Sequence, residues 1–359
     1  MKKRWKGLSV LFLCIVLFLV GCGSKEDGKK EGKKIVLTNG FDKNEVFRIE
    51  TASCSLPEIR VYLTNTKNQY EDIYGSQIWE TKLGSTTLEE NVKETVLAEL
   101  AQIKVMKLLA EKYEVVLTAE EQELAAKAAK EYFSTLNEAE IMALEVTEEL
   151  ITRMYEEYAI ADKVYRYIIK DINPEISDDE ARTITVEHIL IKTYSLDHNG
   201  KRVPFEEAEK RAAYEKAQQV LEELQAGEDF SSLVSKYNED NKSIYSFGKG
   251  ETDTGFEKAA FNLGTDEVSD IVETEYGYHI IKCINTFNRE ETDANKIKIV
   301  EQRRKEVFSQ EYDAFADSLT RNLNTELWES VELTHDEQVT TTEFFGIYDT
   351  WFEGIFEGE

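Results

Sequence analysis

The 359-residue sequence has few of the residues that build metal centres, with four histidines and four cysteines in all. Neither CxxC nor HExxH occurs, and no group of histidines and cysteines has the spacing of a metal site. The GxSxG motif of serine hydrolases and the glycine-rich loop that cradles nucleotide phosphates are absent as well. We therefore predict neither a metal ion nor a cofactor.

Cysteine is also too scarce for a disulfide framework. Cys14 and Cys22 lie near the start of the chain, which leaves Cys54 and Cys283. In an oxidising compartment these two could pair, but two cysteines define no framework, and free thiols are the simpler expectation.

Basic residues are outnumbered, with 43 Lys and Arg against 71 Asp and Glu and a formal net charge of −28. A surface of this sign repels nucleic acid, so we predict no nucleic-acid partner. It could attract cations or basic client proteins, although a solvated acidic surface is the simpler interpretation.

The one long uncharged apolar run is Leu8 to Val20, thirteen residues that follow a basic start. A membrane-spanning helix needs about 20 residues, so a run of this length is more typical of an export signal. It ends in Leu19-Val20-Gly21-Cys22, which resembles the lipobox of bacterial lipoprotein precursors.

The lipobox resemblance implies that residues 1–21 are removed and that Cys22 receives a diacylglycerol. Residues 22–44 begin polar, charged and glycine-rich, which predicts a flexible tether to the folded part. The expected location is the outer face of the bacterial cytoplasmic membrane. The alternative is a short uncleaved anchor in which Cys22 is an ordinary cysteine.

Residues 45–182 have a helical pattern. Thr87–Glu90 and Thr118–Glu121 have the form of capping boxes, and each opens an amphipathic stretch with apolar residues at three- and four-residue steps. Further helices are expected over 138–145 and 147–170. Such helices need a common core to cover their apolar faces.

Residues 183–287 have a different, mixed pattern. It predicts the order β-α-α-β-α-β-β, with β-branched alternation marking the first strand and glycines marking turns. The expected elements are a strand at 185–192, helices at about 205–226, 230–237 and 256–263, a short strand near Gly248, and a closing hairpin at 271–274 and 278–287.

Helix is expected to return within residues 288–332, from about 293 to 326, and to pack on the N-terminal helices. Residues 333–359 are acidic and aromatic but lack helix or strand periodicity. We predict a mostly disordered tail, with docking on a partner or on the protein itself as the alternative.

The mixed region resembles the parvulin family of peptidyl-prolyl cis-trans isomerases. The resemblance rests on VEHILIK (186–192), GEDFSSLVSKYNED (227–240), FGKG (247–250), FEKAAFNL (256–263) and YGYHIIKC (276–283). It implies an α+β protein in which the parvulin-like domain is inserted in a mainly helical chaperone domain, an arrangement similar to that of PrsA and SurA.

The resemblance also implies which residues form the site. His188 and His279 correspond to the paired histidines of the family, and Asp240 and Thr274 to two partners in the same hydrogen-bond network. A simpler interpretation exists for each residue: a lone strand histidine is usually a satisfied core residue, and Asp240 after Asn238 could form an Asx-turn.

For the proline pocket, Phe256 matches the aromatic floor and Ile244 falls near the aliphatic wall. Thr252 stands where the family usually has methionine, and the segment before FGKG lacks the usual glycine-aspartate-leucine-glycine stretch. Phe256 could equally be plain core and Thr252 a surface residue. These departures reduce the expected apolarity of the pocket.

The implied function is a membrane-anchored prolyl isomerase and chaperone whose partners are unfolded or partly folded exported proteins with X-Pro bonds. One alternative is a holdase with a weak or inactive parvulin domain, and a homodimer is left open. A solute-binding lipoprotein is disfavoured because its two α/β lobes do not agree with the long helical stretches.

Overall fold

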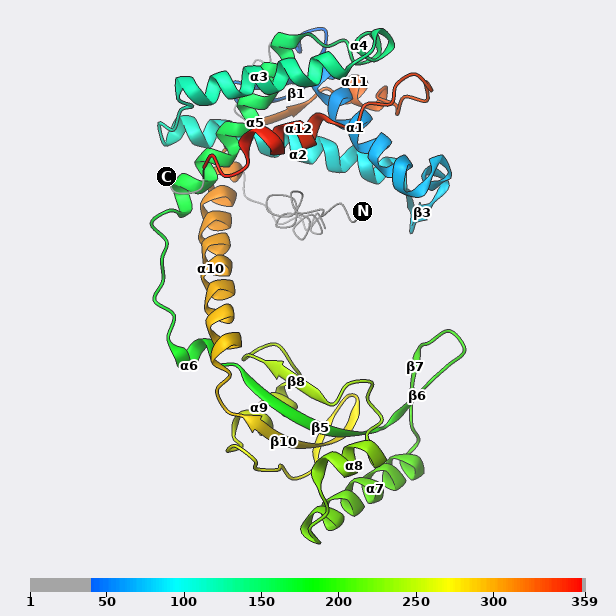
Figure 1. Cartoon of the computed structure of the whole chain (residues 1–359). Helices are drawn as coiled ribbons and strands as arrows, with labels where there is room; N and C mark the ends of the chain where they lie inside the picture. The colour runs from blue at the N-terminus through cyan, green and yellow to red at the C-terminus, as the bar shows by residue number, and fades with distance from the viewer. Residues whose placement is uncertain (1–39, 357–359) are drawn as a thin grey trace, which may run out of the picture. The chain divides into compact units, whose positions relative to one another are not determined.

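The computed structural model describes residues 40–356, and these form two compact units. The helical unit consists of residues 40–172 and 305–356, and the sheet unit of residues 173–304 (Figure 1). The sequence placed the inserted domain at 183–287, somewhat inside the sheet unit. Cys22 and its signal lie outside the described residues. Between residues 40 and 356, none of the helices combines the length and apolarity needed to cross a bilayer.

Five helices form the N-terminal part of the helical unit, and four of them begin at side-chain caps that the sequence carries. Thr87 accepts a hydrogen bond from the Glu90 amide, and Thr118 from the Glu121 amide. The four helices predicted here are confirmed to within a few residues. The five are α1 (Leu56–Tyr74), α2 (Leu88–Lys112), α3 (Ala119–Thr135), α4 (Glu138–Leu144) and α5 (Glu148–Ile169).

A small antiparallel sheet completes this unit, and the sequence did not predict it. Its strand order is β11-β1-β2, so β11 (Arg321–Leu323) pairs with β1 (Glu45–Ile49), which pairs with β2 (Ala52–Ser55). The predicted helix over 293–326 is therefore too long: α10 (Arg289–Asp317) ends before β11, because the backbone there pairs with β1 instead. Three shorter pieces accompany these elements: a 3₁₀ turn (Ser76–Glu80), the hairpin β3 (Lys82–Leu83) and β4 (Thr86–Thr87), and helix α11 (Thr325–Glu329).

The expectation of a mostly disordered tail is wrong for the residues that the structure describes. Helix α12 (Phe344–Phe352) packs against α1 and α3, and Phe344 is 1% exposed in the core of the helical unit. The tail lacks long-range periodicity because it is a single short helix after a stretch that is in neither helix nor strand. Its partners are distant in the sequence, so no local pattern reports them.

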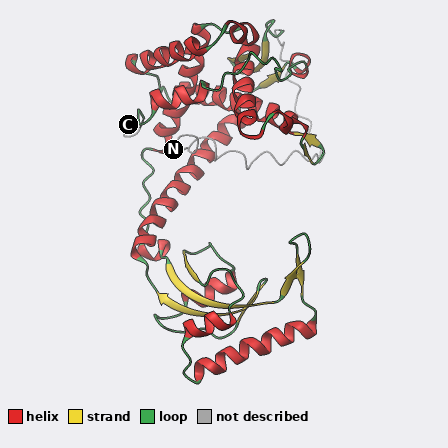
Figure 2. Ribbon diagram, turned by 45° about the vertical axis from the view of Figure 1, so that its right-hand side comes forward, coloured by secondary structure: helices red, strands yellow, loops and turns green. Residues whose placement is uncertain are grey.

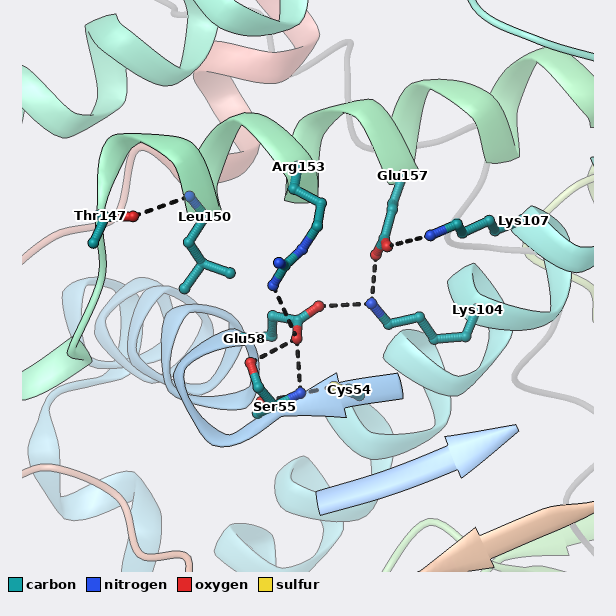
Figure 3. Close-up of polar contacts among 9 residues, drawn as sticks. All are labelled: Cys54, Ser55, Glu58, Lys104, Lys107, Thr147, Leu150, Arg153 and Glu157. Atoms are coloured by element: carbon teal, nitrogen blue, oxygen red, sulfur yellow. Dashed lines mark hydrogen bonds and ion pairs between the residues drawn. The ribbon is translucent and has the colours of Figure 1, made fainter. Parts of the chain in front are cut away.

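A buried ion cluster joins three helices of this unit (Figure 3). The Lys104 ammonium on α2 contacts the carboxylates of Glu58 on α1 and Glu157 on α5, and Lys104 is 1% exposed. Burial opposes the charge on Lys104, but the two carboxylates raise its pKa overall. Lys107 and Arg153 approach the same carboxylates from the more exposed side.

The sheet unit contains a four-stranded antiparallel sheet in the order β8-β5-β10-β9. Its strands are β5 (Ile184–Lys192), β8 (Ile244–Phe247), β9 (Val272–Thr274) and β10 (Gly277–Asn285). A separate hairpin, β6 (Tyr194–Leu196) and β7 (Arg202–Pro204), extends from the end of β5, between the predicted strand at 185–192 and the predicted helix at about 205–226. The predicted α+β class and the order of the main elements are confirmed.

Helices cover both faces of this sheet (Figure 2). The helices α7 (Glu207–Gln225) and α8 (Phe230–Tyr237) pack on the face that carries Ile189, Ile191 and Ile280. The opposite face carries Val186 and Ile281 and is covered by α9 (Thr254–Phe261). A fourth helix, α6 (Asp178–Ala181), precedes β5. Because side chains alternate along a strand, the even-numbered residues of β5 face α9.

Both described cysteines, Cys54 and Cys283, are buried free thiols. Cys54 lies in β2 of the helical unit and Cys283 in β10 of the sheet unit. The less favoured disulfide between them is therefore not formed.

Candidate active site

The register of the two central strands brings His188 and His279 together. His188 on β5 is paired with Ile281, and Leu190 is paired with His279 on β10. The histidines are therefore diagonal neighbours on the same face of the sheet. Their Nδ1 atoms are 3.1 Å apart, and their rings are stacked with centroids 5.3 Å apart. The predicted meeting of these two residues is what the structure shows.

Gly277 fixes this register at the turn between β9 and β10. Its φ is +136°, and a Cβ atom placed there would lie 2.1 Å from the carbonyl oxygen of Ile191. Only glycine permits so close an approach between β10 and β5. The position of His279, two residues further along β10, depends on it.

A directed chain of hydrogen bonds runs through the two histidines. His188 Nε2 lies 3.2 Å from the carbonyl of Lys242 and 3.3 Å from Asp240 Oδ2. Both partners only accept, so Nε2 carries the proton, and in neutral His188 Nδ1 then accepts. His279 Nδ1 must be the donor to it. His279 Nε2 then accepts from the hydroxyl of Thr274 at 2.9 Å, which in turn accepts from the Tyr276 amide.

Burial keeps both imidazole rings in the neutral form that this chain of hydrogen bonds requires. His188 is 2% exposed and His279 5% exposed. Burial lowers the pKa of His188, although the Lys242 carbonyl and Asp240 oppose the shift. Burial and the neighbouring His188 lower the pKa of His279 to about 4. Near pH 7 neither histidine carries a charge.

Asp240 stands at the more open end of the chain, with its side chain 28% exposed. Burial by itself raises the pKa of this carboxyl, but hydrogen bonds from the Tyr245 hydroxyl and the Asn241 amide lower it overall. The expected Asx-turn is also present, because the Asp240 amide donates to Asn238 Oδ1. Asn238, the C-cap of α8, therefore forms the turn, and Asp240 within that turn contacts His188.

Phe256 supplies an aromatic surface beside the histidines. Its ring centroid lies 5.6 Å from that of His188 and 5.1 Å from that of His279, in edge-on geometry. The residue is 7% exposed and belongs to the core beneath α9. Asp253 caps α9 by accepting from the amides of Gly255 and Phe256, which holds the ring in place. Phe256 is therefore both a core residue and a neighbour of the two histidines.

The register does not place Ile244 beside the histidines. Ile244 is paired with Glu187, whose side chain accepts from Ser231 on α8, so Ile244 lies on the other face and is 47% exposed. Tyr245 occupies the position that was expected for Ile244: the Tyr245 ring contacts that of His188, with centroids 5.2 Å apart. The sequence prediction missed Tyr245 because a shift of one residue in a strand exchanges the two faces.

Thr252 precedes α9 and is only partly exposed, which differs from the simple surface position considered for it. Its hydroxyl oxygen is buried and has no hydrogen-bond partner. A buried hydroxyl without a hydrogen-bond partner lowers stability. Thr252 also puts a polar group next to α9, where a methionine would put an apolar one. Among residues 40–356 no group of three or more His, Cys, Asp or Glu side chains could hold a metal ion.

Comparison with known proteins identifies the domain. Residues 188–285 match the family model described as Rotamase, the PPIC-type PPIase domain. Foldase protein PrsA 3 of Bacillus cereus is 31% identical over 187 residues, covering 50% of this chain and 57% of that protein. Foldase protein PrsA of Staphylococcus aureus is 32% identical over 182 residues, covering 48% and 52%. The chain thus spans about half the length of these relatives.

A shorter match is closer in sequence. Foldase protein PrsA of Halalkalibacterium halodurans is 49% identical over 73 residues, which are 19% of this chain and 22% of that protein. Among solved structures, the peptidylprolyl isomerase PrsA of B. cereus covers 75% of this chain and 97% of its own, with 22% identity and a TM-score of 0.36.

Proposed function

We propose that this chain, whose residues 188–285 form a parvulin-type prolyl isomerase domain, is a PrsA-like foldase that isomerises X-Pro bonds in exported proteins and holds their unfolded segments. The proposal rests on one observation: the two neutral histidines, with their Nδ1 atoms 3.1 Å apart, lie beside the ring of Phe256. The helical unit is the proposed chaperone part.

The chemistry needs no nucleophile and no cofactor. Rotation about an X-Pro bond meets a barrier of roughly 18–20 kcal/mol because the planar amide is stabilised by resonance. The twisted amide has lost that resonance and much of its dipole, so an apolar surface favours it over the planar form. Phe256 supplies such a surface next to the two histidines.

The hydrogen-bond chain gives the site a fixed polar edge. Thr274 donates to His279, His279 to His188, and His188 to the Lys242 carbonyl and to Asp240. Neither histidine carries a charge that would have to be desolvated when a proline ring enters. The Tyr245 hydroxyl, at the partly exposed end beside Asp240, is the donor that the turning carbonyl of the substrate would meet there.

A protease-coupled assay with an Ala-Pro peptide tests the proposal on the full chain. We expect acceleration by the wild type and a loss of at least about tenfold in kcat/KM for Phe256→Ala, about 1.4 kcal/mol of transition-state stabilisation. Phe261→Ala is the matched control, since Phe261 is on the same helix and contacts Phe247 instead of the histidines. Equal losses in both variants would assign Phe256 to the core alone.

The alternative is a holdase with a weak isomerase site, and Thr252 is the observation that favours it. Its unpaired buried hydroxyl makes the vicinity of α9 less apolar than a methionine there would. Aggregation of an unfolded client, measured beside the isomerase assay, separates the two functions. Suppressed aggregation without any acceleration of isomerisation would leave only the holdase.

The lipid anchor is part of the same proposal. Its support is the Leu19-Val20-Gly21-Cys22 pattern after a short apolar run, together with the resemblance of the chain to PrsA foldases. A diacylglycerol on Cys22 would hold the foldase at the outer face of the cytoplasmic membrane, where exported chains emerge. In cells, Cys22→Ser should block labelling with radioactive palmitate, whereas continued labelling would contradict the anchor.

A further inference from the structure

Side chains of the helical unit bind the backbone of its tail. Residues 339–343 are in neither helix nor strand. Carbonyls in this stretch and in its flanking residues accept hydrogen bonds from four side chains, which lie on α1, on α5 and at the N-cap of α4. These are Asn137 to Gln338, Asn68 to Val339 and Thr341, Gln69 to Thr342, and Tyr155 to Phe344, at 2.7–3.1 Å.

Two backbone amides of the tail are bound in the same manner. The Thr340 amide donates to Glu140 Oε1 at 2.8 Å, and the Phe344 amide donates to Asn65 Oδ1 at 3.1 Å. Because these hydrogen bonds go to the main chain of the tail, they do not depend on which side chains the bound segment carries. We call Asn65, Asn68, Gln69, Asn137, Glu140 and Tyr155 the backbone-binding surface.

Aromatic contacts provide the remaining attachment. Phe344 stacks on Tyr155 with centroids 4.7 Å apart and also meets Tyr62 and Tyr132. Further along, Tyr348 packs on Tyr158 at 4.4 Å. In Figure 1 the tail, drawn in red, lies among the helices that supply these residues. An aromatic segment is thus bound by tyrosine rings and amide side chains.

The fit of this tail is imperfect. The hydroxyl of Tyr348 is buried without a hydrogen-bond partner, although the residue is 6% exposed. A buried hydroxyl left unpaired weakens the docked state relative to a detached tail whose hydroxyl meets water. A core selected only for stability has no need of that oxygen.

We propose that the backbone-binding surface is a site for aromatic segments of unfolded polypeptides, and that residues 338–356 occupy it as an internal ligand which such a segment displaces. The surface recognises main-chain groups and aromatic rings, and unfolded clients expose both. This inference rests on the proposed chaperone function and names the client site within it. Competition with the tail limits client binding to the fraction of molecules whose tail is detached.

Hydrogen–deuterium exchange of the full chain tests the displacement. The probe is reduced, carboxymethylated lysozyme, which cannot refold. Adding it should speed exchange in residues 338–356, because the displaced backbone loses its side-chain partners. If the client binds and exchange in the tail stays unchanged, the inference fails while the chaperone function stands. If no client binds to the wild type or to the variants below, both fail.

Two substitutions at one position should shift client affinity in opposite directions. Tyr348→Phe removes the unpaired hydroxyl, tightens the tail and should weaken lysozyme binding about tenfold. Tyr348→Ala removes the contact with Tyr158 and should strengthen binding by a similar factor. Tyr74→Phe, at a position 56% exposed on α1, is the control and should change nothing.

The conservative variant keeps the test decisive if Tyr348→Ala fails to fold. Unchanged or stronger client binding by Tyr348→Phe would show that the tail is ordinary core and overturn the inference. Displacement by a second copy of this chain instead of the client would appear as dimerisation of Tyr348→Ala, and it too would overturn the assignment to clients.

Discussion

In the helical unit Lys104 is buried between Glu58 and Glu157, whereas in the sheet unit His188 and His279 are buried at a similar depth. The first group is charged: contact with the carboxylates raises the pKa of Lys104, and the pKa of Glu58 is lowered although burial opposes it. The second group is neutral, because burial lowers the pKa of both histidines.

The difference shows two ways of keeping polar groups inside a protein. The ion cluster is tolerated only while every charge has its partner, so it fixes how α1, α2 and α5 pack (Figure 3). The two histidines carry no charge and cost less to bury, so they can stand beside an apolar substrate surface. The first arrangement is structural, and the second suits a site.

The largest effect is expected from breaking the ion cluster. Lys104→Met leaves Glu58 and Glu157 buried without their shared cation and should lower the free energy of unfolding of the helical unit by about 3–5 kcal/mol. Urea denaturation measures it. The control Lys127→Met removes an exposed pair with Glu123 and should cost less than about 1 kcal/mol. A similar decrease in the free energy of unfolding for both variants would show that the buried cluster contributes no more to stability than an exposed ion pair.

A steric change at Gly277 should perturb the sheet unit in turn. Gly277→Ala places a methyl group against the Ile191 carbonyl and should destabilise this unit by about 3 kcal/mol, with loss of isomerase activity as His279 shifts. Exchange protection of β10 and the isomerase assay report it. Gly264→Ala, where the nearest atom is the flexible Glu267 carboxylate at 3.3 Å, is the control. Equal protection of β10 in both variants would refute the close approach.

Acid should weaken the sheet unit through His279. Its pKa is about 4 in the folded state and 6.5 in the reference state, so between these values the unfolded chain binds the extra proton. Stability from this group is complete above pH 6.5 and decreases as pH falls toward 4, by as much as about 3 kcal/mol. Urea titrations of wild type and His279→Asn at pH 7.5 and 4.5 measure it, and an identical pH dependence in both would contradict the assignment.

The smallest effect concerns the docked tail. Burial, followed by Asp162 and Glu353, raises the pKa of Asp349 from 3.8 to about 6. The docked state therefore holds the proton more tightly, and docking weakens as pH rises from about 4 to 6. Because Asp349 is partly exposed, we expect about 1 kcal/mol. Asp349→Asn should remove this dependence from tail exchange rates, corrected for intrinsic pH effects; an unchanged dependence would exclude Asp349 as its source.

The sequence predicted most of what depends on local patterns. Thr87 and Thr118 cap helices where their capping boxes placed them, since a cap acts on the next few residues. The strands β1, β2 and β11 were missed because each has five residues or fewer, and because β11 pairs with β1, which is remote from it in the sequence. Docking of α12 was left as the alternative to disorder for the same reason.

The site was predictable in part. His188, His279, Asp240 and Thr274 lie in one hydrogen-bond chain, and the parvulin-like motifs had indicated them together. The prediction for Ile244 was wrong because alternate residues of the four-residue strand β8 face opposite sides of the sheet, and the sequence does not show which residues face the histidines. The neutral states of the histidines follow from burial, which sequence alone does not quantify.

The most direct test of the neutral histidine chain is long-range ¹⁵N–¹H NMR of the imidazole nitrogens in the full chain at pH 7. The structure predicts two neutral rings, with the proton on Nε2 of His188 and on Nδ1 of His279. A doubly protonated imidazolium at either position, or the opposite tautomers, would contradict the account of the site.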